Sequence, residues 1–404
     1  MNDVIKPQEP LRHFPFADGL GEVNSRLDRV HTAVSDNFNP RDAALEIAQK
    51  LRPDESACVM FFCSPRYDLK VLAEALKGHF VGTTLIGCTT AGEISQRGLT
   101  ENSITALSLP KSHFVVEAML LDQLAFVGGD RISAAVQDKV YALEKRAIAM
   151  APGQNFAFAL LDGTSIREEI MLGLLADTLG GMPLIGGSAG DGLDFGDTYV
   201  FHNGEFHSGA AVMLLVNTRC PFRVVSGHHF GALGEKLVVT RADPERRVVQ
   251  EINAEPAAPE YCRVMGLSLD QLNASTFALN PLGVRVGENL YVRSIQSVND
   301  DLSLTFFCAI DTGIVLSKLN NIGMVEHFQA MMREVSDSIG DTQIVIGADC
   351  IHRVIEAEER GLARSLSTAY RKHRVIGFNT YGEQRDGLHL NHSFTGIAIG
   401  APMY

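Results

Sequence analysis

The sequence predicts an α/β fold with mixed sheets, built from repeated strand–helix–strand units and divided into two domains. Three observations carry this prediction. A short motif occurs three times, each copy follows an apolar run and a helical segment, and each copy precedes a further apolar run. Short apolar runs that alternate with helical patterns are typical of α/β layering, and an internal repeat indicates the architecture of the whole chain.

The repeated motif stands at the end of each predicted buried strand. Its copies are LIGCTTAGE (residues 85–93), LIGGSAGD (residues 184–191) and VIGFNTYGE (residues 375–383). Glycine at a strand end allows a sharp turn or the close approach of a ligand, although such glycines also serve simply as connections. We expect Gly87, Gly186 and Gly377 to lie at equivalent strand ends, at one shared rim.

The other elements are predicted from local signals. Residues 165–168 (Ser-Ile-Arg-Glu) form a capping-box pattern that predicts a helix start, and Asn203-Gly204 predicts a hairpin turn between two strands. The apolar runs before the motifs span residues 57–63, 155–161 and 343–348, and those after them span residues 104–109, 210–216 and 394–400. Further helices are predicted over residues 39–51, 68–78, 131–150 and 323–339, and further strands over residues 112–121, 284–298 and 302–309.

A change of character near residue 225 predicts the domain boundary. Residues 221–300 are punctuated by Pro244, Pro256 and Pro259, and proline interrupts helices and central strands. We therefore predict an N-terminal domain over residues 30–225 and a C-terminal domain over residues 226–404.

The composition narrows the classes of partner. A chain of 404 residues with 46% hydrophobic and 21% charged residues fits a soluble globular protein. The net charge of −13 argues against nucleic acid or an anionic membrane surface as the partner, and no apolar run approaches the roughly 18 residues of a membrane-spanning helix. The seven cysteines are odd in number and scattered, which favours a reduced compartment, and we expect the protein in the cytoplasm.

Several segments together resemble the FIST proteins, a bacterial sensory module with FIST-N and FIST-C domains. The resemblance rests on LIGCTTAGE, LIGGSAGDG, NPLGVRVGENLYVRSI (residues 280–295) and the tail GFNTYGEQRDGLHLNHSFTGIAIG (residues 377–400). The tail is most similar to the subgroup that senses nitric oxide through haem, which pairs Thr-Tyr-Gly-Glu-Gln with a downstream His and Asn.

The resemblance implies a haem b cofactor, binding of nitric oxide, and regulation of a histidine kinase or of a diguanylate cyclase or phosphodiesterase in biofilm control. It implies a signalling role in a two-component system and no enzymatic activity. The sequence carries no kinase, cyclase or DNA-binding pattern, so we expect such a sensor to act on another protein. A homodimer or higher oligomer is also expected.

His389 is the expected proximal ligand of the haem iron, because the tail of the subgroup carries a histidine at this place. Histidine is one of the residues that ligate haem iron. Alternate residues of a strand share a face, so His389 and Asn391 would point together over a mouth formed by Tyr381 and Glu383. Glu383 and Asn391 are the expected partners of the second imidazole nitrogen, and Phe378 is an expected part of the apolar wall.

Other side chains are weaker candidates for the iron. His392 is out of phase with His389 along the strand, and the adjacent His228 and His229 would face apart on the surface. His352 is expected near an exposed helix start, and Cys220 precedes a proline as in some thiolate haem sites. A Cys-x-x-Cys-His pattern is missing from the sequence, which excludes covalently attached haem.

The acids that end the motifs have two interpretations. Glu93, Asp191 and Glu383 take the same place in the three copies, where they could serve acid–base chemistry or accept hydrogen bonds from turn amides. Repetition favours the structural role, because catalysis rarely needs three copies of one residue.

Two further functions stay open. A haem-free FIST module would bind a small polar metabolite such as an amino acid in a cleft near Arg285, Arg293 and Thr89-Thr90, where arginine grips a carboxylate with two bonds. An enzyme would use Glu383 and His389 as an acid–base pair, although no nucleophile motif accompanies them.

Overall fold

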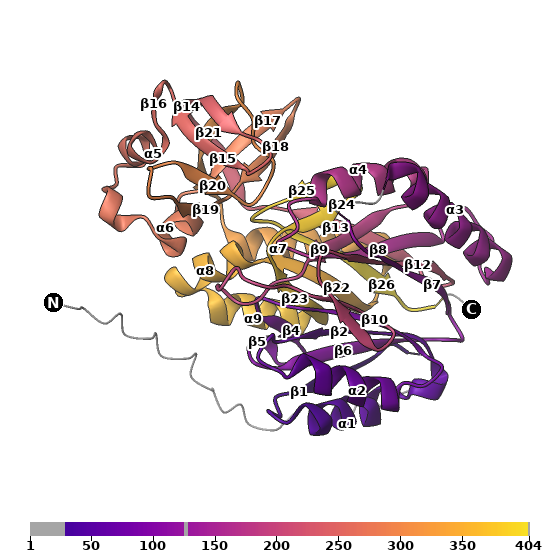
Figure 1. Ribbon diagram of the computed structural model, residues 1–404. Helices are drawn as coiled ribbons and strands as arrows, with labels where there is room; N and C mark the ends of the chain where they lie inside the picture. The colour runs from indigo at the N-terminus through magenta and orange to yellow at the C-terminus, as the bar shows by residue number, and fades with distance from the viewer. Residues whose placement is uncertain (1–28, 125–127, 403–404) are drawn as a thin grey trace.

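The computed structural model describes residues 29–124 and 128–402 and confirms the α/β fold with mixed sheets. Within these residues the chain forms three six-stranded sheets and one eight-stranded sheet. The six-stranded sheets are built from the three repeats, and we call them the first, second and third sheet. Together they make the three-sheet body, which occupies the larger part of Figure 1.

Each repeat contributes the same series: an edge strand, a helix, a buried strand, one or two helices, the motif strand, a short hairpin and a last strand. The first repeat comprises β1 (His31–Ser35), α1 (Pro40–Leu51), η1 (Pro53–Glu55), β2 (Ser56–Cys63), α2 (Leu69–His79), β3 (Thr84–Thr89), β4 (Glu93–Ser95), β5 (Gly98–Thr100) and β6 (Ile104–Pro110). The second comprises β7 (Phe114–Leu121), α3 (Gly129–Arg146), β8 (Asn155–Leu161), α4 (Glu168–Leu179), β9 (Leu184–Ser188), β10 (Val200–His202), β11 (Glu205–His207) and β12 (Ala211–Thr218). The third comprises β13 (Phe222–Gly227), α7 (Met324–Ile339), β22 (Thr342–Cys350), α8 (Ile351–Glu359), α9 (Ala363–Lys372), β23 (Val375–Thr380), β24 (Glu383–Arg385), β25 (Leu388–Leu390) and β26 (Phe394–Gly400).

The hairpins are exchanged between the repeats. Four strands of a repeat pair with one another, and a hairpin of a different repeat completes their sheet. The strand orders are β1-β6-β2-β3-β10-β11, β7-β12-β8-β9-β24-β25 and β13-β26-β22-β23-β4-β5. The exchange is cyclic, since the second repeat completes the first sheet, the third completes the second, and the first completes the third. The three repeats are therefore interlocked into one body.

The equivalence of the repeats extends to single residues. In each repeat the buried strand and the motif strand are a parallel pair, and the motif glycine lies opposite a buried-strand residue, Phe61 in the first repeat. A Cβ atom on Gly87, Gly186 or Gly377 would meet the carbonyl oxygen of that opposite residue. Only glycine permits this backbone approach, and the predicted equivalence of the three glycines is confirmed.

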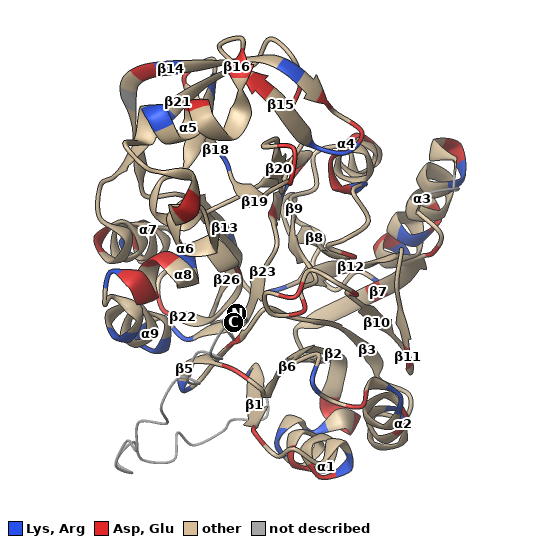
Figure 2. Cartoon of the chain, turned by 60° about the vertical axis from the view of Figure 1, so that its left-hand side comes forward, with Lys and Arg blue, Asp and Glu red and all other residues tan. Residues whose placement is uncertain are grey.

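The core lies between the three sheets. One cluster of buried apolar side chains draws on the inward faces of all three, with Phe62, Phe158 and Ile346 among its members. The outward faces are covered by α1 and α2, by α3 and α4, and by α7 and α9, which lie around the outside of the three-sheet body in Figure 2. Burying a side chain of this size contributes roughly 1.5–3 kcal/mol, so both faces of every sheet stabilise the body.

The eight-stranded sheet belongs to an insert domain, which we define as residues 230–321. It leaves the third repeat after β13 and returns before α7, and it has its own apolar core. Both views place it at one end of the three-sheet body (Figure 1, Figure 2). Its elements are β14 (Phe230–Asp243), β15 (Val248–Ile252), β16 (Glu255–Pro256), α5 (Ala257–Met265), η2 (Leu269–Gln271), α6 (Ala274–Leu279), β17 (Leu282–Val286), β18 (Asn289–Arg293), β19 (Ile295–Val298), β20 (Leu304–Phe306) and β21 (Val315–Asn321).

The predicted boundary between residues 225 and 226 falls inside β13, which pairs with β26. The path of the chain is therefore better described by three repeats and one insert. The hairpin at Asn203-Gly204 is confirmed by the pairing of β10 with β11.

The predicted capping box is wrong. Helix α4 begins at Glu168 with Arg167 before it and no side-chain cap. The Ser165 hydroxyl donates instead to the carbonyl oxygen of Asp162, and Ile166 has a left-handed φ of 53°. The local turn at the end of β8 thus outcompetes the capping pattern.

Charge is mixed on the surface. Acidic and basic residues alternate along α1 and α3 in Figure 2, so the negative net charge is not gathered on these helices. Within residues 29–124 and 128–402, each helix is too short or too polar to cross a membrane.

Candidate functional site

The three motif loops meet at one place. The Ala91 amide donates to the Asn379 carbonyl oxygen at 3.0 Å, and the Gly190 amide donates to the Thr89 carbonyl oxygen at 3.0 Å. The Ser188 amide donates to the carbonyl oxygen of Gly382 at 2.9 Å. Each motif loop is thus hydrogen-bonded to a loop of another repeat, which agrees with the prediction that the three motifs lie at one shared rim.

All three motif acids accept hydrogen bonds from backbone amides, and two of them do so at equivalent places. Glu93 Oε2 accepts from the amide and hydroxyl of Ser103, and Glu383 Oε2 accepts from the amide and hydroxyl of Ser393. Burial raises the pKa of Glu93 to about 7, and burial raises the pKa of Glu383 well above its ordinary value. These contacts agree with the interpretation that the acids accept hydrogen bonds from turn amides. They also show that Glu383 bonds to Ser393 and not to His389.

Asp191 does not occupy the position on the hairpin that Glu93 and Glu383 occupy. The expectation that the three acids take the same place is therefore wrong for the second motif. In the sheets, Glu93 lies opposite Phe378 and Glu383 lies opposite Gly187, and the residue at the corresponding position of the second hairpin is Val200. Asp191 instead accepts from the amides of the loop that follows it, at Phe195 and Gly196. The extra residues between the second motif and its hairpin move the acid away.

His389 lies on β25 at the junction of three segments. Its Nε2–H donates to the carbonyl oxygen of Phe307 in the insert domain at 3.3 Å, and its ring packs on Gly382, where any Cβ would collide with it. The side chain is 6% exposed. Burial lowers the pKa of His389 despite the opposing charges of Glu168 and Glu169, so the imidazole is neutral near pH 7.

A salt-bridged arginine joins the insert domain to α4 beside this histidine. Arg247 donates through Nη1 to the Phe307 carbonyl oxygen at 2.7 Å and through Nη2 to Glu168 at 2.6 Å. Nη2 also contacts Glu169 at 2.5 Å, and the second oxygen of Glu169 accepts from the Ala309 amide at 2.6 Å. His389 is therefore flanked by two carboxylates and one guanidinium.

The hairpin of the third repeat carries a polar residue pair at a position where the other two hairpins carry an apolar pair. In each sheet the first strand of the exchanged hairpin places one residue opposite the motif glycine. That residue is paired with a residue on the second strand of the same hairpin. The pairs are Ile94 with Leu99, Phe201 with Phe206, and Gln384 with His389. The first two pairs are apolar and pack under helices. The third is polar and buried, and both amide atoms of Gln384 and Nδ1 of His389 lack a hydrogen-bond partner among the described residues.

The other predicted site residues are dispersed. Tyr381 directs its hydroxyl to Asp191 and its ring to Phe195, with ring centroids 4.9 Å apart. Asn391 is buried, and its amide has no partner within the described ranges. Phe378 stacks on Phe62 in the central core, with ring centroids 4.6 Å apart.

A haem needs an apolar slot beside its axial ligand. The described surroundings of His389 include Gly382, the Phe307 carbonyl oxygen, Gln384, Arg247 and two carboxylates. Phe378 packs in the central core instead. Two cavities among the described residues, of about 300 and 370 Å³, are lined by other residues and do not include His389. In this arrangement the residues around His389 do not fit haem b.

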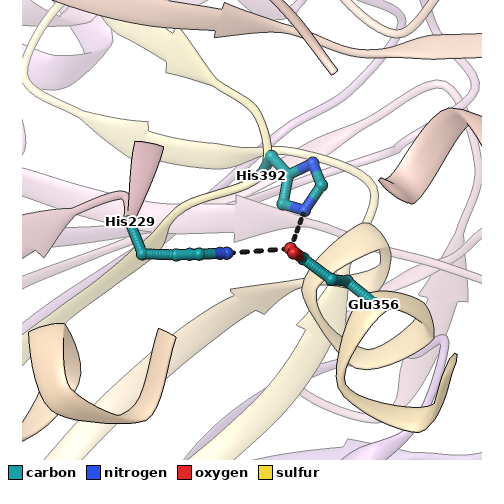
Figure 3. Close-up of side chains that lie close together, drawn as sticks. All are labelled: His229, Glu356 and His392. Carbon is teal, nitrogen blue, oxygen red and sulfur yellow. Dashed lines mark hydrogen bonds and ion pairs between the residues drawn. The ribbon is translucent and has the colours of Figure 1, made fainter. Parts of the chain in front are cut away.

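A second polar cluster lies at the root of the insert domain. Glu356 Oε2 is 2.8 Å from Nε2 of His229 and 3.0 Å from Nε2 of His392 (Figure 3). All three side chains are fully buried. His229 and the nearby His352 were expected at the surface, and burial of both corrects that expectation; it lowers the pKa of each to about 3.

The three groups are close enough to suggest a metal centre, but the contacts fit a hydrogen-bond network. Arg353 Nη1 lies 2.8 Å from Nδ1 of His229. Arginine only donates, so Nδ1 is the acceptor and the proton of the neutral ring is on Nε2, pointing to Glu356. A protonated nitrogen cannot ligate a metal, and Glu356 therefore acts as a hydrogen-bond acceptor.

The remaining sequence candidates do not form a site. Arg285 is exposed on β17, whereas Thr89 and Thr90 are buried in the first motif loop. The Thr90 hydroxyl donates to Glu93 at 2.6 Å. Cys220 is buried, and burial raises the pKa of its thiol.

Comparison with known families agrees with this geometry. The family model of the FIST N domain matches residues 57–255, and that of the FIST C domain matches residues 257–385. The chain belongs to the FIST family. It is also 26% identical, over 89% of its own length and 77% of the relative's, to an uncharacterized protein of Methanocaldococcus jannaschii. FIST domains indicate a sensory module of signal transduction.

Sequence reasoning missed Gln384, Arg247 and Glu356. A signal for Gln384 was present, because aligning the three hairpins places it with Ile94 and Phe201. Arg247 and Glu356 gave no such signal, since their partners are far away along the chain.

Proposed function

We propose that this FIST protein senses a small polar ligand at the buried Gln384–His389 pair. One observation carries the proposal: the pair is polar and largely unpartnered at a position where both other repeats have an apolar pair. An unpaired buried polar group costs about 1–3 kcal/mol. The fold does not require that cost, since Ile94–Leu99 and Phe201–Phe206 seal the same position.

The chemistry of the pair indicates the ligand class. With its proton on Nε2, His389 offers Nδ1 as an acceptor, and the Gln384 amide offers one acceptor and one donor group. Glu168 and Glu169 outnumber Arg247 around the site, which favours a neutral or cationic molecule. The ligand is a small amine, amide or amino acid that presents N–H donors.

Thermal unfolding with a panel of amines, amides and amino acids tests this function. A compound at 100 times its Kd should stabilise the protein by roughly 2.7 kcal/mol. The variant Gln384→Ile with His389→Leu should lose the response, and Arg285→Ala, on the exposed face of the insert, should keep it. If the compounds leave wild type unchanged, or stabilise the double variant equally, the ligand does not bind at this pair.

Haem b and nitric oxide sensing are the second candidate. The observation in favour is that Nδ1 of His389 has no partner in the described part of the chain. Haem binding would require the residues around His389 to move from the arrangement described above, which does not fit the cofactor. Purified protein from cells supplied with a haem precursor should show a Soret band that responds to dithionite and to nitric oxide. His389→Ala should lose the band, and His207→Ala, on strand β11, should keep it. A wild type without the band contradicts haem binding.

The expected partners belong to the same proposal. A sensory module in the cytoplasm would act on a histidine kinase, a diguanylate cyclase or a phosphodiesterase, as a homodimer or higher oligomer. Pull-downs in both ligand states should recover such an enzyme, and recovery in neither state contradicts the proposed partner.

A further inference from the structure

His392 departs from the repeat in a second way. It lies two residues before the last strand, β26, and the residues at the same place in the other repeats are Asn102 and Gly209. All three have left-handed backbones, with φ of 55°, 59° and 53° for Asn102, Gly209 and His392. Glycine adopts this conformation freely, and asparagine does so more readily than most other residues. Histidine is a less favourable choice for the backbone alone.

The side chain of His392 has a use that compensates for this backbone. Its Nε2–H donates to Glu356 Oε2 at 3.0 Å. Burial raises the pKa of Glu356, but the hydrogen bonds from His229 and His392 outweigh it and hold the pKa well below its ordinary value. Glu356 is therefore an ionised, buried carboxylate with a full set of donors.

Arg360, at the end of the helix that carries Glu356, also donates to Glu356 Oε1 at 2.7 Å. The remaining two donors come from the points where the chain enters and leaves the insert domain. His229 directly precedes β14 and donates to Oε2, and Asn321 ends β21 and donates through Nδ2 to Oε1 at 2.6 Å. The two strands also pair with each other there, Phe230 opposite Asn321. Glu356 thus accepts hydrogen bonds from His392 and from both of these points, which we call the two crossings of the insert domain.

His392 is three residues from His389. The link between them is Leu390 and Asn391, and the Asn391 amide has no partner within the described residues that would hold it in place. A displacement of β25 at His389 therefore reaches His392 over a short covalent path. From His392 it passes to Glu356 and to both crossings.

We propose that His392 is the residue that couples the Gln384–His389 site to the insert domain. The proposal rests on the proposed function for its biological meaning, but the coupling itself exists without a ligand. When the β24–β25 hairpin moves, His392 weakens its bond to Glu356, and the crossings at residues 228–230 and 321–323 open more often.

A double-mutant cycle read by hydrogen exchange tests this coupling. His389→Ala perturbs the site, and His392→Asn replaces the histidine by the residue of the first repeat. We expect His389→Ala to accelerate exchange at the two crossings by about two-fold or more, which corresponds to the lower end of the coupling energies of residues in one hydrogen-bond network. In the His392→Asn background the crossings should already exchange faster, and His389→Ala should add little.

Two controls separate coupling from general damage. Asn102→Gly changes the same left-handed position in the first repeat and should leave the crossings unchanged. Glu356→Gln should reproduce the effect of His392→Asn. Additive effects of His389→Ala and His392→Asn, or an unchanged exchange rate in His392→Asn, overturn the proposal. Failure of every ligand in the thermal assay would instead overturn the proposed function and leave this result standing.

Discussion

Replacing the polar pair by the apolar pair of the first repeat should stabilise the fold. The change is Gln384→Ile with His389→Leu, which makes the third hairpin match Ile94 and Leu99. Gln384 is fully buried with both amide atoms unpaired, and His389 is buried with Nδ1 unpaired, among the described residues. Removing two such groups should recover about 2–6 kcal/mol, at about 1–3 kcal/mol each.

One interaction is lost in exchange. The bond from His389 to the Phe307 carbonyl oxygen disappears, at a cost of about 0.5–1.5 kcal/mol, but Arg247 still donates to that oxygen. Imperfect packing of the new side chains costs a further 1 kcal/mol or so. Taken at the middle of these ranges, the expected net gain in free energy of unfolding is about 2 kcal/mol.

Urea unfolding followed by circular dichroism measures the gain. The matched control inserts the polar pair where the fold has an apolar one, as Ile94→Gln with Leu99→His, and should destabilise the protein by several kcal/mol. A double variant at residues 384 and 389 that is less stable than wild type would refute the reasoning. It would mean that the polar pair is structural and that its apparent lack of partners is met in some other way.

Three further predictions follow from buried groups. Burial raises the pKa of Glu93 from 4.5 to about 7, so its contribution to the free energy of unfolding is fully present below pH 4.5 and is lost as the pH rises through 7. Between pH 5 and pH 8 the free energy of unfolding should fall by about 2.5 kcal/mol, and Glu93→Gln should abolish this fall. Gly87→Ala forces a Cβ to within 2.5 Å of a carbonyl oxygen and should lower the free energy of unfolding by roughly 1–3 kcal/mol or more. Gly78→Ala, in open space on α2, should raise it by up to about 1 kcal/mol. Equal effects of the two variants in urea unfolding would contradict the packing at Gly87. Arg247→Ala leaves Glu168 buried and unpaired and should cost roughly 3–5 kcal/mol, while the exposed neighbour Arg246→Ala should be nearly neutral in the same assay.

The sequence was informative where the cause is local. Apolar runs and the three motifs predicted the strands of each repeat, and the steric need for glycine at Gly87 was readable because it repeats. The capping pattern at residues 165–168 failed because Asp162 offers Ser165 a competing acceptor. That failure also arose from local chemistry, but from a residue outside the pattern.

Long-range pairing set the limit for the candidate site. Strand alternation correctly placed His389 on a buried face, but it assigned Glu383 as its partner, whereas Glu383 bonds Ser393. The true neighbours, Arg247 and Phe307, are more than 80 residues away. The exchange of hairpins was equally inaccessible, because each hairpin has the same local pattern whichever sheet it joins.

The hairpin exchange determines when the chain can finish folding during synthesis. The hairpin β4–β5 belongs to the first repeat, but its sheet is built from β13, β22, β23 and β26, most of which leave the ribosome last. Until then it is an exposed strand edge, of the kind that invites association with other chains.

The order of completion is therefore fixed by the exchange. The first sheet closes once β11 has emerged, the second waits for β25, and the third waits for β26. A ribosome that stops before residue 388 would release a chain with one finished sheet and open edges on the other two. Nascent chains of this protein should thus need protection from aggregation until β26 has been made.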